Sequence, residues 1–364
     1  MSRPSTIATV AKHLLLQASQ RLGTADPRPL VGDYLDQSLG IPVDEPLVGR
    51  RRLLETNFSE TTPENLAFMV ADAPRLSPAD RVETASSAMS RLVGDSFGSD
   101  ARSWLDSRAE GARGLSHQRS TSWGASLSSA FDRNGMTEAA VHYEWGPMLM
   151  DSLPAPLYRI ARVAMETLSG LRPAISSIRC GRSSGSQQIT FEIERPLALS
   201  SLQPLMERLG IGHQHGSLMS TCAFILGARF TLPPETAMLT LRPARTGVEL
   251  RLDVNLDALP DPPSQLMALT RLQMTERPRS LQALDRWMIA MTPDGYPGPG
   301  TISVLSIWVR PDMPARVALY LNPAVMQQRQ GAVPAPEVPA VVAPSAAVVQ
   351  SLDEPSWSSA AWSP

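Results

Sequence analysis

The sequence predicts an α+β protein in which one large antiparallel β-sheet is covered by amphipathic helices. Segments with alternating apolar and polar residues occur in pairs along the chain, and turn-forming residues separate the two members of each pair. Segments with helical periodicity stand between the pairs. Together these observations predict about five repeated helix–hairpin–helix units, and therefore about ten strands.

Four predicted strands show the alternation most clearly: LETNFS (54–59), QITFEIE (188–194), VELRLDVNL (248–256) and RVALYLN (316–322). Turns are predicted at 134–135, 183–185, 245–247 and 311–314, where Gly, Asn or Pro interrupts the alternation. The apolar residues that we expect to pack against helices are Ile189, Ile193, Leu250, Leu252, Leu319 and Leu321. The polar residues that we expect to line one common cavity are Gln188, Thr190, Glu249, Arg251, Tyr320 and Asn322.

Helical periodicity is found in 153–170, in 200–210 and in two segments, 264–273 and 280–291, on either side of Pro278. The segment 200–210 begins with serine, a good helix cap, and 153–170 and 200–210 both end in glycine. The apolar stripes of these helices need the apolar face of the sheet as a partner. The polar face then looks either to bulk water, in an open sheet, or into a lumen, in a closed barrel. The pattern alone is compatible with both.

The chain of 364 residues divides into a body and a tail. Residues 1–325 carry the periodic segments and are predicted to form one domain. Residues 326–364 are rich in Pro, Ala, Val and Ser and have no periodicity, which predicts a disordered tail. The alternative for the tail is that Trp357 and Trp362 form a docking motif.

Composition excludes several classes of protein. The net charge of −2 argues against a nucleic-acid partner, and no apolar run reaches the length of a membrane span. The first residues contain no stretch typical of a signal peptide, and two cysteines cannot form a disulfide framework, so we expect a cytoplasmic protein without a membrane partner. For the oligomeric state, the sequence is compatible with both a monomer and a homodimer. Of 33 basic residues only Lys12 is lysine, so any bound anion must be held by arginine, histidine or backbone N–H groups.

Four segments together carry a resemblance to a known family: 53–68, 128–145, 240–263 and 284–323. In order and spacing they resemble the aromatic prenyltransferases of the ABBA fold, the dimethylallyltryptophan synthases and especially their bacterial indole-prenylating branch. The resemblance spans roughly residues 10–325. It implies a closed antiparallel barrel of about ten strands ringed by helices. It also implies transfer of a dimethylallyl-type group from an allylic diphosphate to an indole or related aromatic acceptor.

The resemblance implies roles for particular residues. Glu55 stands where the family has the glutamate that accepts the indole N–H proton. The family holds diphosphate with inward-facing cations on successive strands. This sequence departs from those positions, and the strand arginines that could replace the missing cations are Arg179, Arg242, Arg251 and Arg316. The family shields its allyl cation with aromatic rings, for which the candidates here are Tyr320, Trp308 and Tyr143. No metal is required; Mg²⁺ is possible, but the sequence has no DDxxD or similar ligand motif.

The sequence departs from the family pattern at the diphosphate site. Ala140 stands at the expected lysine, His142 at the tyrosine after it, and Gln188, Thr190 and Glu192 replace a basic run. For Arg251 an alternative is pairing with the acids on its own face, Glu249 and Asp253. Two hypotheses follow. Either other arginines hold the diphosphate, or the barrel has lost this site and binds or otherwise transforms an aromatic or peptide ligand.

Overall fold

The computed structural model describes residues 6–43, 52–71, 76–116, 123–146 and 149–327, and the structural statements below refer to these residues. The predicted tail lies outside them, except for Met326 and Gln327, which belong to the short helix α10 (Ala324–Gln327). Within the described residues, no helix is both long and apolar enough to cross a membrane.

The strands form a closed antiparallel barrel in the order β1-β12-β11-β10-β9-β6-β5-β4-β3-β2, which confirms the barrel over the open sheet. Closure leaves the sheet no free edge. The strands are β1 (Leu54–Ser59), β2 (Leu66–Ala71), β3 (Ala125–Asp132), β4 (Gly135–Glu144), β5 (Leu171–Gly181), β6 (Gly185–Ile193), β9 (Ala237–Ala244), β10 (Gly247–Asn255), β11 (Gly300–Arg310) and β12 (Met313–Pro323). Two further strands of two residues each, β7 (Leu197–Ala198) and β8 (Thr231–Leu232), pair with each other outside the barrel.

The four predicted turns all connect neighbouring strands of the barrel. The β3–β4 turn follows from Asn134–Gly135, since Gly135 has φ of 109°, a backbone conformation that side chains rarely allow. Gly247 opens β10 in the same way with φ of 134°. The hairpins therefore have a local cause, whereas closure of the barrel depends on pairing between β1 and β12, at the two ends of the domain.

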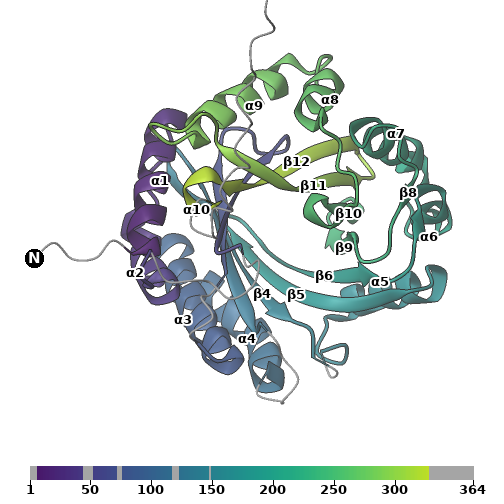
Figure 1. The fold of residues 1–364 in the computed structure, drawn as a ribbon. Coiled ribbons are helices and arrows are strands. Elements are labelled where there is room, and N and C mark those ends of the chain that lie inside the picture. The colour runs from purple at the N-terminus through teal and green to yellow at the C-terminus, as the bar shows by residue number, and fades with distance from the viewer. Residues whose placement is uncertain (1–5, 44–51, 72–75, 117–122, 147–148, 328–364) are drawn as a thin grey trace, which may run out of the picture. The chain divides into compact units, whose positions relative to one another are not determined.

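Helices ring the outside of the barrel, as Figure 1 shows. They are α1 (Ile7–Leu22), α2 (Arg28–Leu39), α3 (Pro78–Phe97), α4 (Ser99–Ser116), α5 (Ala155–Thr167), α6 (Gln203–Arg208), α7 (His215–Ile225), α8 (Leu266–Gln273) and α9 (Pro278–Met291). The predicted serine cap of the 200–210 helix is wrong. The serines lie inside a 3₁₀ turn, Leu199–Leu202, and α6 starts after it without a side-chain cap.

The hydrophobic core lies between the barrel and the helices. The outward-facing residues of the predicted strands, among them Ile189, Leu250 and Leu319, are fully buried there. On β1 the outward Phe58 meets Trp287 of α9, with ring centroids 6.0 Å apart. The apolar side chains therefore leave the lumen to polar ones, as the alternation predicts.

Candidate active site in the barrel lumen

The lumen contains a cavity of about 650 Å³ to which all ten barrel strands contribute residues. Of the six polar residues expected to share one cavity, Thr190, Arg251 and Tyr320 line it. Gln188, Glu249 and Asn322 do not line it, so that prediction is correct only in part. Glu249 and Asn322 lie near the ends of β10 and β12, which extend beyond the cavity. Gln188 lies within β6, where its Oε1 accepts a hydrogen bond of 3.4 Å from Arg179 Nη1.

Glu55 of β1 points into this cavity and is 5% exposed. Its Oε1 accepts a hydrogen bond of 2.6 Å from Ser303 Oγ, and Arg52 Nη1 lies 3.1 Å away. Arg52 is also bound to Asp257, at 2.6 Å. Burial raises the pKa of Glu55, and the charge of Arg52 and the Ser303 hydrogen bond oppose that rise without cancelling it. The side chain is thus a carboxylate with raised basicity.

Arg179 and Arg251 line the cavity, and each is paired with a carboxylate. Arg179 binds Glu138, and Arg251 Nε donates to Asp253 Oδ2 at 2.8 Å. The alternative reading of Arg251, as a partner of an acid on its own strand, is therefore confirmed for Asp253.

Arg242 and Arg316 do not line the cavity. Arg242 donates to both oxygens of Glu249, at 2.7 and 2.8 Å, because β9 and β10 place the two residues directly opposite each other. Arg316 contacts the carbonyl oxygen of Ala315 and lies four residues before Tyr320 on β12, about 13 Å along the strand. The prediction that Arg316 faces the ligand space with the other arginines is wrong because strand position, which alternation does not report, takes it towards the β11–β12 turn.

Tyr320 and Trp308 line the cavity, and burial raises the pKa of the Tyr320 hydroxyl. The guanidinium of Arg251 lies 5.1 Å from the centre of the Trp308 ring, and that of Arg242 lies 6.0 Å from it. The prediction for Tyr143 is wrong. Its side chain lies on the outer face of β4, where its hydroxyl is 2.9 Å from Ser86 Oγ of α3.

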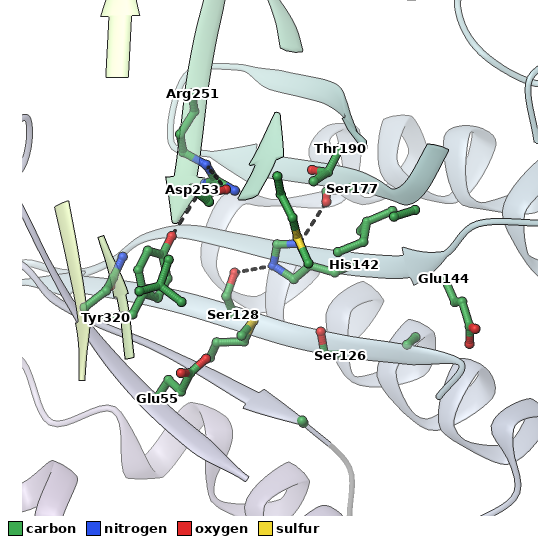
Figure 2. Close-up of a pocket in the computed structure, with 18 of the residues that line it drawn as sticks. Glu55, Ser126, Ser128, His142, Glu144, Ser177, Thr190, Arg251, Asp253 and Tyr320 are labelled. Carbon is green, nitrogen blue, oxygen red and sulfur yellow. Dashed lines mark hydrogen bonds and ion pairs between the residues drawn. The ribbon is translucent and has the colours of Figure 1, made fainter. Parts of the chain in front are cut away.

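His142, next to Tyr143, takes the inward face and was assigned no role from the sequence. Its Nε2 lies 2.9 Å from Ser128 Oγ and its Nδ1 lies 2.8 Å from Ser177 Oγ, and Figure 2 shows both hydrogen bonds. Burial, with the charges of Arg179 and Arg251, lowers the pKa of His142 to about 3. The alternation of β4 puts His142 on the same face as Glu138 and Glu144, and this was the available signal.

The charges around the cavity balance. Five arginines line it (Arg52, Arg81, Arg172, Arg179 and Arg251), as do five carboxylates (Glu55, Glu138, Glu144, Glu192 and Asp253). The neutral His142 adds no charge at pH 7. In the described part of the chain, no three His, Cys, Asp or Glu side chains come together as possible metal ligands.

No protein family model and no curated protein sequence matches the chain. Solved structures do match it, at low sequence identity. The 6-dimethylallyltryptophan synthase from Micromonospora olivasterospora, in complex with DMASPP and Trp, has a TM-score of 0.69 and 13% identity, covering 87% of this chain and 97% of that one.

Two further structures agree. The 5-dimethylallyltryptophan synthase from Streptomyces coelicolor, also in complex with DMASPP and Trp, has a TM-score of 0.66 and 15% identity, covering 93% of this chain and 99% of that one. PriB in its binary complex with product diphosphate has a TM-score of 0.64 and 14% identity, covering 87% and 96%. With its closed barrel of ten strands ringed by helices, the chain therefore has the fold of the ABBA aromatic prenyltransferases.

Proposed function

We propose that this protein is an aromatic prenyltransferase that moves a dimethylallyl-type group from its diphosphate to an indole or related ring. The observation that carries the proposal is Glu55, a buried carboxylate with a raised pKa on the wall of the barrel cavity. A ring N–H directed at this carboxylate loses its proton as the new bond forms, and the ring becomes a stronger nucleophile. The two structurally similar dimethylallyltryptophan synthases, whose crystal structures contain DMASPP and Trp, support the same substrate class.

The diphosphate is assigned to Arg179 and Arg251, while Arg242, which does not line the cavity, adds positive charge near Arg179. A leaving diphosphate carries about three negative charges and needs several cationic donors. Arg179 and Arg251 both reach the cavity, and their charges act on the same histidine, which indicates that they lie near each other. Each must exchange its carboxylate partner for the ligand, so binding here requires side-chain rearrangement.

The allyl cation is assigned to the Tyr320 and Trp308 side of the cavity. An aromatic face stabilises a cation, and the Trp308 ring already has Arg251 at 5.1 Å. Movement of Arg251 towards the diphosphate would free that ring face for the cation. The barrel strands shield the cation from water along the walls of the lumen, which favours transfer to the ring over hydrolysis.

The test is incubation of the purified protein with dimethylallyl, geranyl or farnesyl diphosphate and a panel of indoles, with products read by mass spectrometry. We expect a product heavier by one prenyl group with the wild-type protein and at least a hundredfold less with Glu55→Gln, since a positioned general base is worth about 10²–10⁴ in rate. Absence of any prenylated product across the panel would overturn the proposal.

The balanced charge of the cavity favours a second candidate, a barrel that binds or transforms an aromatic or peptide ligand without diphosphate. The lining offers no net positive charge, because five arginines face five carboxylates. Calorimetry separates the two candidates. Binding of an indole without measurable binding of dimethylallyl diphosphate supports the second, and binding of both supports the first.

A further inference from the structure

A hydrogen-bonded chain of three side chains crosses one wall of the cavity. Ser128 Oγ lies 2.9 Å from His142 Nε2, and His142 Nδ1 lies 2.8 Å from Ser177 Oγ. The chain spans three adjacent strands, β3, β4 and β5, and all three side chains line the cavity. Figure 2 shows it in the middle of the pocket, with Arg251 and Glu55 also labelled there.

The strand register relates this chain to Glu55. Glu55 is directly opposite Met69 of β2, and Met69 is directly opposite Ser128 of β3. The carboxylate and the Ser128 end of the chain therefore stand at the same level of the barrel, two strands or about 10 Å of wall apart. A ring whose N–H faces Glu55 can then bring its carbon edge towards Ser128.

The imidazole in this chain is neutral. Burial is the main reason for its low pKa of about 3, and the nearby positive charges of Arg179 and Arg251 lower it further. A neutral imidazole has one nitrogen that donates and one that accepts. With Nδ1–H donated to Ser177, Nε2 accepts from the Ser128 hydroxyl and leaves the Ser128 oxygen free to take a proton.

Prenyl transfer to a ring carbon requires a proton acceptor near that carbon. The attacked carbon holds both its hydrogen and the new prenyl group, and the ring regains aromaticity only when that proton leaves. With its nitrogen proton on Glu55 the ring is neutral, and when Glu55 returns that proton the ring becomes a cation that is strongly acidic at the attacked carbon. A weak base then suffices there, provided that it is unprotonated and in place. Glu55 is already engaged with the ring nitrogen.

We propose, on the basis of the proposed function, that Ser128, His142 and Ser177 form the relay that removes the ring proton after prenyl transfer. The ring proton passes to Ser128 Oγ as the Ser128 hydroxyl proton passes to His142 Nε2. The electrons of the broken C–H bond return to the ring, whose nitrogen has regained its proton from Glu55, so that one proton in all is lost and it rests on His142. The resulting imidazolium, held by Ser177, lies on the side of Arg179 and Arg251, where the released diphosphate balances its charge.

The experiment uses the full chain with dimethylallyl diphosphate and L-tryptophan, either unlabelled or deuterated at all carbons of the indole ring. In the wild type, we expect proton removal to be fast and the two tryptophans to react at equal rates. In His142→Gln and Ser128→Ala we expect turnover to fall at least about tenfold and a primary isotope effect to appear, because proton removal then limits the rate.

Ser86→Ala is the matched control. It removes a hydroxyl hydrogen bond of the same length, 2.9 Å, to the residue next to His142, but on the outer face of β4. We expect no isotope effect in this variant. A His142→Gln or Ser128→Ala protein that reacts at the wild-type rate overturns the relay. So does a slower variant without an isotope effect, because its loss is then structural.

Failure of the relay is distinguishable from failure of the proposed function. If the wild type prenylates tryptophan and the variants behave like the control, the transferase stands and the relay falls. If the wild type forms no product with this acceptor or with the indole panel, both fall.

Discussion

Ser303 donates a hydrogen bond of 2.6 Å to Oε1 of Glu55, although the two residues are 248 positions apart in the chain. Ser303 lies at a β-bulge, where the register of β11 against β12 shifts between Ile302 and Val304. A bulge redirects side chains relative to the regular alternation. The candidate base is therefore held by a residue whose direction depends on an irregularity of the barrel.

Removal of this hydrogen bond is expected to change the pH dependence of the reaction. The bond favours the charged carboxylate, so Ser303→Ala raises the pKa of Glu55 further above its usual 4.5. The carboxylate then forms at higher pH, and the acidic limb of the rate profile moves to higher pH. The measurement is kcat/KM against pH for both proteins. A limb that stays in place or moves to lower pH contradicts the assignment.

Burial of Glu55 also predicts a pH-dependent stability. Its pKa is raised in the folded protein, so the unfolded chain releases this proton more readily. Its contribution to the free energy of unfolding is complete below the usual pKa of 4.5 and is lost as pH rises through the raised folded value. Denaturant titration of wild type and Glu55→Gln at pH 4 to 8 tests this, since the difference between the two proteins should change with pH in that direction. A difference in the free energy of unfolding that does not change with pH would contradict the raised pKa of Glu55 in the folded protein.

The carboxylate partners of the arginines are expected to weaken diphosphate binding. Glu138→Gln releases Arg179 from its ion pair, and we expect dimethylallyl diphosphate to bind about tenfold more tightly, the value of one charge-assisted hydrogen bond. Arg251→Ala should weaken binding by a similar factor. Arg316→Ala is the control, because Arg316 lies outside the cavity. Isothermal titration calorimetry is the measurement, and equal affinities in all four proteins would contradict the assignment of diphosphate to Arg179 and Arg251.

Removal of residues 328–364 is expected to leave the melting temperature and any turnover unchanged. The composition of this segment gives it no apolar periodicity with which to pack. The cut belongs after Gln327, because Val325 and Met326 of α10 are buried. Thermal denaturation of both chains is the measurement. A loss of more than a few degrees would instead favour a docking role for Trp357 and Trp362.

The sequence by itself determined the local structure of this protein. The β1 strand, Leu54–Ser59, has the bounds that its alternation predicts, and the Asn134–Gly135 turn has the glycine conformation that a tight hairpin requires. The inward direction of Glu55 and Tyr320 also follows from alternation within one strand. These features depend on residues close together in the chain, which is why a single sequence is sufficient to predict them.

Only the tertiary structure decided which inward residues share the cavity. Arg316 and Tyr320 lie on one face of β12, yet only Tyr320 lines the cavity, because position along the barrel depends on the stagger between strands. Tyr143 and His142 are neighbours, and a shift of one residue in register would exchange their faces. Packing of Tyr143 against Ser86 of α3 settles that choice and turns His142 into the lumen. Which face a residue takes, and whether it reaches the cavity, depends on contacts between segments that are distant in the chain, and a local sequence pattern carries no information about those contacts.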